Sequence, residues 1–175
     1  SEITFKSESN SLAKKLQKLS VKKMEKLMHV SSELAQLNVQ RYADWTEEIH
    51  ENTTSFPAIF GFNGEVYKGF DADSLTEKQR FFAQENVRIL SGLYGVLKPL
   101  DQIEIYRLEM AQRGVAPDGR SLYEFWRLKV ENYLLKAMAK EEYLLNLASS
   151  EYSDLLQSPK LRLRMVTPHF FEEKS

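Results

Sequence analysis

The sequence contains no cysteine. A disulfide framework, a thiolate zinc site, an iron–sulfur cluster and a cysteine nucleophile are therefore excluded. Apolar runs of membrane-spanning length and a signal-peptide pattern are also missing, so we expect a cytoplasmic protein with no membrane partner. Glycine-rich phosphate loops and the His-Glu-x-x-His motif are absent, and the three histidines lie far apart. We predict no catalytic residue, no metal site and no cofactor, although an enzyme is not excluded.

Charge is balanced over the chain but unevenly distributed. The 175 residues carry 24 Lys and Arg against 25 Asp and Glu, a net charge of −1, so the whole molecule is not a strongly basic nucleic-acid binder. Residues 1–30 hold seven lysines and three glutamates, whereas residues 31–85 hold four basic and ten acidic residues. This pattern allows a two-signed surface, but solvated helix faces are the simpler interpretation. With 42% hydrophobic residues, the length suits one compact domain.

The first third of the chain predicts three short helices and a hairpin. Leu12 and Leu16 recur at helical spacing, and Ser20 and Ser31 are placed to cap two further helices before residue 46. A polar loop is expected over 47–54. Residues 58–69 then predict two strands joined by an Asn-Gly type I′ turn, because Asn and Gly tolerate the positive φ angles of that turn.

The remaining chain predicts helices and strands in mixed order. Capping boxes at Ser74/Glu77 or Thr76/Gln79 open one helix, and a box at Ser121 with Glu124 opens a longer one. Strands are expected over 144–147 and 161–165, with a short helix beginning after Ser149. Because there is no regular βαβ order, we predict an α+β fold with a mixed sheet and surrounding helices.

The segment 90–100 has two glycines and a proline, which prevent an ordinary helix. It is either a buried, kinked strand or a turn between helices. In a helix-hairpin-helix module, such a turn offers backbone N–H groups to DNA phosphate and a nearby cation adds charge. Gly92, Gly95 and Lys98 are the candidates for this role. The alternative is a kink where two backbones pack closely.

Cationic side chains in the middle of the sequence are further candidates. Arg107 alternates with apolar neighbours in an extended segment and either clamps an anion or pairs internally with Glu109. Lys68, in Tyr67-Lys68-Gly69, and Arg120, in Asp118-Gly119-Arg120, are predicted to reach the same cleft.

Five ordered stretches resemble the YaaA family of bacterial peroxide-stress proteins. They are Phe62–Gly69, Leu90–Asp101, Tyr106–Met110, Leu122–Trp126 and Asn146–Tyr152. The resemblance covers nearly the whole chain. It implies an unusual α+β fold, a positively charged cleft, a helix-hairpin-helix-like element and binding of double-stranded DNA. It also implies a protein of the hydrogen peroxide response that limits iron-dependent damage, with no secure reaction or metal ligand.

The predicted site combines this resemblance with the residue analysis. The DNA-binding candidates are Lys68, Gly92, Gly95, Lys98, Arg107 and Arg120, and the candidate cleft-lining tyrosines are Tyr67, Tyr94 and Tyr123. The alternative is an enzyme or a binder of a small phosphorylated or anionic ligand in the same cleft. Family members usually open with an apolar strand before Ser-Pro-Ala-Lys and continue to a basic Lys-Lys-Ala-Arg-Gly segment. Both are missing, so we expect residues 1–175 to be a single YaaA-like domain that is incomplete at both ends.

Overall fold

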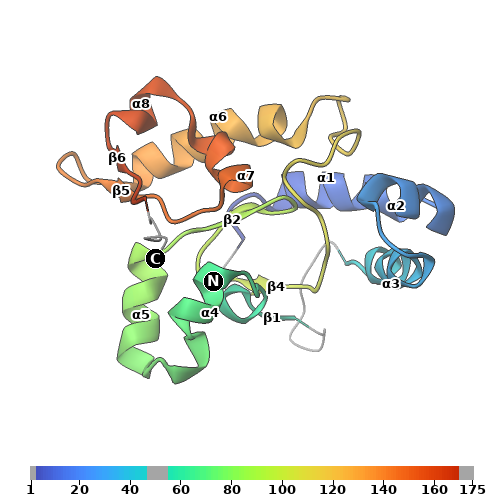
Figure 1. Cartoon of the computed structure of the whole chain (residues 1–175), viewed down its shortest axis with the longest axis horizontal. Helices are drawn as coiled ribbons and strands as arrows, with labels where there is room; N and C mark the ends of the chain where they lie inside the picture. The colour runs from blue at the N-terminus through green and yellow to red at the C-terminus, as the bar shows by residue number, and fades with distance from the viewer. Residues whose placement is uncertain (1–2, 47–54, 170–175) are drawn as a thin grey trace, which may run out of the picture.

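The fold is α+β, as predicted, in a single compact domain (Figure 1). The computed structural model describes residues 3–46 and 55–169. Within these residues the β structure is divided into three two-stranded sheets instead of one continuous sheet. Helices α2 and α3 lie together at one end, α4 and α5 lie at the other, and α6 runs along one side (Figure 1).

The three predicted N-terminal helices are present. They are α1 (Lys6–Gln17), α2 (Val21–Met28) and α3 (Ser32–Ala43). Leu12 and Leu16 are buried on the inner face of α1, and the Ser31 hydroxyl accepts from the Leu34 N–H at the start of α3. The Ser20 side chain makes no such bond at the start of α2. The polar loop predicted over 47–54 lies outside the described residues.

The hairpin predicted over 58–69 is wrong. The structure has β1 (Phe56–Pro57), the 3-10 turn η1 (Ala58–Phe60), helix α4 (Glu65–Phe70) and the 3-10 turn η2 (Ala72–Ser74). Gly64 has a φ of −75° and precedes α4, so the type I′ turn does not form. Strand β1 pairs instead with β4 (Gln102–Ile103) in an antiparallel sheet.

The glycine-rich segment forms a buried β-hairpin. It follows α5 (Glu77–Asn86), whose Thr76/Gln79 capping box is confirmed. Strands β2 (Ile89–Ser91) and β3 (Gly95–Leu97) are antiparallel, and the turn at residues 92–94 joins them. The helix-hairpin-helix-like element is therefore not confirmed, because this turn connects two strands and not two helices. The stretch 106–110, predicted as a strand or an extended segment, has no regular secondary structure up to Glu109 and a turn at Met110, and the irregular segment begins at Glu104.

The long predicted helix is α6 (Leu122–Ala137), and its capping box is confirmed. The Ser121 hydroxyl accepts from the Glu124 N–H, while the Glu124 carboxylate accepts from the Ser121 N–H. Helix α6 packs against β3 and places Trp126 in the centre of the core.

The C-terminal part is only partly as predicted. It contains β5 (Leu144–Leu145), α7 (Ser150–Ser153), the 3-10 turn η3 (Asp154–Leu156), α8 (Pro159–Arg162) and β6 (Met165–Val166). Residues 161–165 were predicted as a strand, but helix α8 ends at Arg162, and only Met165 of that range is in a strand. Strand β6 pairs with β5 in parallel. Ser158 caps α8 by accepting from the Leu161 N–H, and Pro159 suits the first helical position.

Candidate functional site

The predicted cations are paired with acids close to them in sequence. Lys68 Nζ lies 2.6 Å from a Glu65 oxygen, Arg107 Nη2 lies 2.8 Å from Glu109, and Arg120 Nη2 lies 2.5 Å from Asp118. All three pairs are largely exposed, and exposed ion pairs contribute little to stability. The two hollows described below bring no two of these side chains together, and only Arg107 lines one of them.

The glycine turn is buried, and two of its backbone amides already form hydrogen bonds within the protein. The Leu93 and Tyr94 N–H groups both donate to the Ser91 hydroxyl oxygen, at 3.2 and 2.9 Å. A Cβ on Gly92 would overlap the Leu108 carbonyl oxygen. This geometry matches close backbone packing, the alternative interpretation of the segment, and not phosphate binding by the turn.

Gly95 and Lys98 have separate roles in the hairpin. Gly95 has a φ of +72°, and a Cβ there would lie 2.6 Å from the Trp126 ring. Lys98 follows β3 and is partly buried, and its backbone N–H donates to Asp101 Oδ2 at 2.8 Å. Neither residue presents a backbone donor to an external phosphate in this arrangement.

The three candidate tyrosines are divided between core and surface. Tyr94 is fully buried, and its hydroxyl oxygen accepts from the Glu104 N–H at 3.1 Å. The Tyr123 hydroxyl donates to the Glu151 carbonyl at 2.8 Å. Tyr67 is partly buried and stacks on Phe62, with 5.3 Å between ring centroids. None of the three lines the hollow described next, although Tyr67 and Tyr94 belong to the ring cluster beside it.

The five stretches behind the family resemblance meet in the folded chain. Trp126 Nε1 donates to the Gly92 carbonyl at 2.9 Å, and Gly92 packs on Leu108. The Glu151 carboxylate accepts from the Ala111 N–H at 3.0 Å, beside Tyr123. Rings from three of the stretches form one cluster of Phe62, Tyr67, Tyr94 and Tyr106.

A small hollow opens beside this ring cluster. We call it the aromatic hollow. It has a volume of about 180 Å³ and is lined by Phe56, Gly61, Phe62, Ile103, Glu104, Ile105, Tyr106, Arg107, Leu108, Glu109 and Tyr152. Of the predicted site residues, only Arg107 lines it. Sequence analysis missed Glu104 and Tyr152 as site residues, although Tyr152 ends one of the five stretches.

Burial keeps the tyrosines of this region protonated. The Tyr106 hydroxyl lies 2.6 Å from Ser91 Oγ, and burial raises its pKa well above the ordinary value. Burial also raises the pKa of Tyr67 to about 12 and the pKa of Tyr152 above its usual range. Burial raises the pKa of the Glu104 carboxyl as well, although the Thr46 hydroxyl donates to it at 3.1 Å. The hydroxyls of the three tyrosines therefore carry their proton at neutral pH and can donate hydrogen bonds.

A second, larger hollow runs along α1. This lysine groove has a volume of about 820 Å³ and is lined by Lys6, Ser7, Asn10, Ser11, Lys14, Lys15, Lys18 and Pro117. Lys14 and Lys18 are four residues apart and share one helix face. Within the described residues, its lining contains four lysines and no carboxylate. The sequence predicted a solvated helix face for these lysines. The groove was not predicted, because its other wall comes from a loop about a hundred residues further along the chain.

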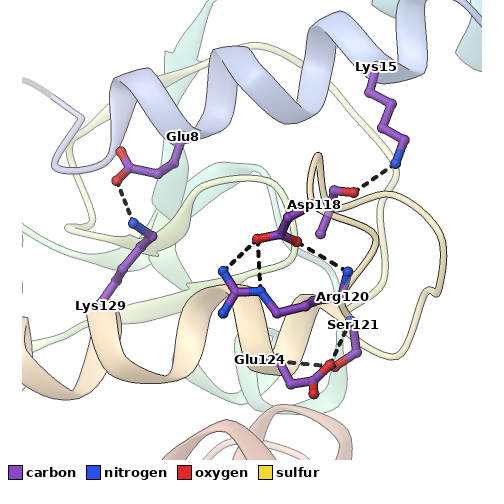
Figure 2. A network of polar contacts seen from close by, with 8 residues as sticks. Glu8, Lys15, Asp118, Arg120, Ser121, Glu124 and Lys129 are labelled. Atoms are coloured by element: carbon purple, nitrogen blue, oxygen red, sulfur yellow. Dashed lines mark hydrogen bonds and ion pairs between the residues drawn. The ribbon is translucent and has the colours of Figure 1, made fainter.

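Polar contacts hold that loop and helix α6 against α1 (Figure 2). Lys15 Nζ donates to the Ala116 carbonyl at 2.7 Å, and Lys129 Nζ lies 3.0 Å from Glu8. Figure 2 shows Lys15 pointing toward the loop that carries Asp118 and Arg120, just before the capping box of α6. Arg120 is therefore near the lysine groove, whereas Arg107 lines the aromatic hollow. The hydrogen bond between the Arg120 and Asp118 side chains raises the pKa of Arg120 and lowers the pKa of Asp118.

The described residues contain neither a cluster of potential metal ligands nor a helix suited to span a membrane. Over residues 3–46 and 55–169, no three His, Asp or Glu side chains gather in a way that could hold a metal ion. None of the helices in these two ranges has the length and apolarity to cross a membrane.

Comparison with known proteins identifies the family. The chain matches the family described as peroxide stress protein YaaA over residues 1–175. It is 46% identical over 172 residues to a UPF0246 protein of Polynucleobacter necessarius. This match covers 97% of the chain and 66% of the relative. UPF0246 proteins of Neisseria meningitidis serogroup A and Flavobacterium psychrophilum are 44% and 41% identical, over 96% and 95% of the chain and 65% and 66% of the relatives. The chain thus spans about two thirds of the length of these relatives, and it belongs to the peroxide stress protein YaaA family.

Proposed function

We propose that this protein acts in the hydrogen peroxide response by binding duplex DNA through phosphate contacts, without reading bases and without catalysing a reaction. The family supports the stress role. The lysine groove is the observation that supports DNA as the partner. Peroxide and ferrous iron generate hydroxyl radical, so a protein that covers DNA would limit iron-dependent damage. The cytoplasm is the location that this proposal requires.

The lysine groove concentrates positive charge on a nearly neutral molecule. Four ammonium groups line one wall, while the whole chain carries a net charge of −1. Lysine recognises phosphate as a flexible point charge and does not require a particular base sequence. Serine and asparagine side chains between the lysines offer neutral hydrogen bonds to phosphate oxygens. The groove therefore suits a nucleic-acid backbone better than the region around Arg107.

The DNA-binding residues predicted from the sequence differ in where they lie relative to the lysine groove. Arg120 lies on the loop that forms the second wall of the groove and can exchange its exposed partner Asp118 for a phosphate. Lys68, Lys98 and Arg107 do not line the groove. Their contact with DNA, and that of Gly92 and Gly95, stays a prediction. The same holds for the treatment of residues 1–175 as one YaaA-like domain.

The salt dependence of binding tests the proposal. The logarithm of the affinity for a duplex should fall linearly with the logarithm of salt concentration, by about 0.9 per phosphate neutralised. The double variant Lys14→Gln/Lys18→Gln should bind more weakly at low salt, with a slope reduced by about 0.9 for each lysine removed. Gel-shift titrations at several salt concentrations measure both the affinity and the slope.

A matched control removes the same charge elsewhere. Lys22 and Lys23 are exposed on α2 and do not line the groove. The variant Lys22→Gln/Lys23→Gln should retain most of the affinity and slope. Equal losses in both double variants would show that only total charge matters. Absence of duplex binding at low salt, or a strong preference among unrelated duplex sequences, would overturn the proposal.

A further inference from the structure

The aromatic hollow is not used by the proposed function. It shares no lining residue with the lysine groove. Residues from β1, β4, α7 and the irregular segment 104–109 form its walls. Three of the five stretches that resemble the family contribute lining residues, yet duplex binding along α1 needs none of them. Ligand binding in this hollow is therefore independent of duplex binding in the lysine groove.

Its walls suit a flat ring. Phe56, Phe62 and Tyr152 contribute partly buried rings, and Ile103 contributes an aliphatic surface. Tyr106 meets Phe62 edge to face, with 6.5 Å between ring centroids. Aromatic walls stabilise planar ligands by stacking and by excluding water. At about 180 Å³, the hollow accommodates one or two small rings and excludes a duplex backbone.

The charged side chains of the hollow do not favour an anion. Arg107 is neutralised by Glu109 at 2.8 Å, which leaves the buried carboxyl of Glu104 as the uncompensated acid. A carboxylate accepts hydrogen bonds and repels phosphate. The predicted clamp for a phosphorylated ligand is therefore less favourable here than a neutral ligand that donates N–H groups.

One donor in the hollow has no hydrogen-bond partner among the residues that the structure describes. Tyr152 lines the hollow, and no side chain or backbone group of the described residues forms a hydrogen bond with its hydroxyl. Glu104 accepts from Thr46, but a carboxylate has about four acceptor positions, so capacity remains. A ligand that accepts from Tyr152 and donates to Glu104 would satisfy both groups. Burial keeps the pKa of Tyr152 high, so the donor persists at neutral pH.

We propose that the aromatic hollow binds a nitrogen heterocycle of nucleobase size that carries an exocyclic amino group. The ring packs against the aromatic side chains, the amino group donates to the Glu104 carboxylate, and a ring nitrogen or carbonyl accepts from the Tyr152 hydroxyl. Adenine, cytosine and guanine have such an amino group. Uracil and thymine do not, and they are the poorer ligands.

Calorimetric titration with nucleosides tests this proposal directly. Adenosine, cytidine and guanosine should bind, and cytidine should bind more tightly than uridine. The difference should be about three- to tenfold, as expected for one hydrogen bond. Ribose 5-phosphate should not bind in the hollow. Binding of ribose 5-phosphate with no nucleoside binding would overturn the proposal and support an anion site.

Single variants connect the binding to the hollow. Tyr152→Phe keeps the ring and removes the hydroxyl, so affinity should fall about three- to tenfold. Tyr143→Phe is the matched control, because Tyr143 is 70% exposed and does not line the hollow. Glu104→Gln should reduce the preference for cytidine over uridine, because an amide can also donate to a uracil carbonyl. An unchanged preference, or equal effects of the two tyrosine variants, would contradict the assignment.

The base can come from a free nucleoside or from an unpaired nucleotide in DNA. A single-stranded cytidine oligonucleotide and a blunt duplex distinguish these sources. Competition between cytidine and the single strand, sensitive to Tyr152→Phe, assigns the hollow to unpaired DNA bases. Nucleoside binding without such competition assigns it to free nucleosides. Neither result depends on the Lys14→Gln/Lys18→Gln variant, so duplex binding and base binding fail separately.

Discussion

At the scale of single residues, two glycines show how little space the core leaves. Gly92 lies against the Leu108 backbone and Gly95 lies against the Trp126 ring. The sequence analysis offered phosphate binding or close packing for this pair, and the geometry matches close packing. Glycine is needed at Gly95 for two reasons, its positive φ and the missing Cβ.

Substitution of Gly95 should be strongly destabilising. Gly95→Ala imposes a left-handed conformation that costs about 1–2 kcal/mol and adds overpacking against Trp126 of about 1–3 kcal/mol. Gly114→Ala is the matched control, because Gly114 has a φ of +76° and open space around a Cβ. Gly114→Ala should lower the free energy of unfolding only by the cost of the left-handed conformation, about 1–2 kcal/mol. Urea unfolding measures both free energies, and equal losses would show that the contact with Trp126 is unimportant.

At the scale of secondary-structure elements, capping signals predicted better than alternation of apolar and polar residues. The boxes at Thr76/Gln79 and Ser121/Glu124 both open helices. Alternation over 161–165 predicted a strand, but Ser158 and Pro159 open helix α8 just before it. Both residues are visible in the sequence and would have corrected that prediction.

The hairpin predicted over 58–69 failed for a different reason. The pattern from Glu65 to Gly69 is too short to distinguish a strand from one or two helical turns. Helix α4 forms because Tyr67 packs on Phe62 while Val66 stays 51% exposed. Phe62 also packs on Tyr106, far along the chain, and that tertiary contact cannot be seen in the local pattern. Strand β1 likewise finds its partner β4 about forty-five residues later.

The cap of α6 provides a test at this scale. Ser121→Ala removes the hydroxyl that accepts from the Glu124 N–H and should destabilise the protein by about 1 kcal/mol. Ser20→Ala is the control, because Ser20 occupies the same position before α2 without a side-chain hydrogen bond. Its effect should be close to zero. Thermal unfolding followed by circular dichroism compares them, and similar losses would mean that the bond at Ser121 contributes nothing.

At the scale of the whole molecule, the sequence predicted the fold class and the family but not the arrangement of charge. Lys68, Arg107 and Arg120 were expected in one cleft, yet each pairs with an acid within three residues. The lysines of α1 line a groove only because Pro117 lies opposite them. Such long-range proximity depends on the folded path of the chain and has no local signature in the sequence.

Buried tyrosines make the stability of the whole molecule sensitive to alkaline pH. Burial raises the pKa of Tyr42, Tyr94, Tyr106 and Tyr152, and raises that of Tyr67 to about 12. Below the ordinary tyrosine pKa of about 10, these groups are neutral in both states and their contribution is fully present. As pH rises above about 10, the unfolded chain ionises first, so stability falls by up to about 1.4 kcal/mol per pH unit for each tyrosine.

Urea unfolding at several alkaline pH values tests this expectation. Stability should change little from these groups up to about pH 9 and fall steadily between about pH 10 and 12. Tyr67→Phe should make the fall shallower, because one of the titrating groups is removed. Tyr143→Phe should leave it unchanged, since Tyr143 is exposed. A Tyr67→Phe curve parallel to that of the unsubstituted protein would refute the assignment.

The chain contains two tryptophans, and both touch the buried β2–β3 hairpin. The Trp45 ring lies 5.7 Å from that of Tyr94, and the Trp126 indole donates to the Gly92 carbonyl. Intrinsic tryptophan emission therefore reports on the surroundings of this hairpin from two sides, without an attached dye. A shift of the emission maximum on adding a small molecule would mean that the centre of the protein has responded.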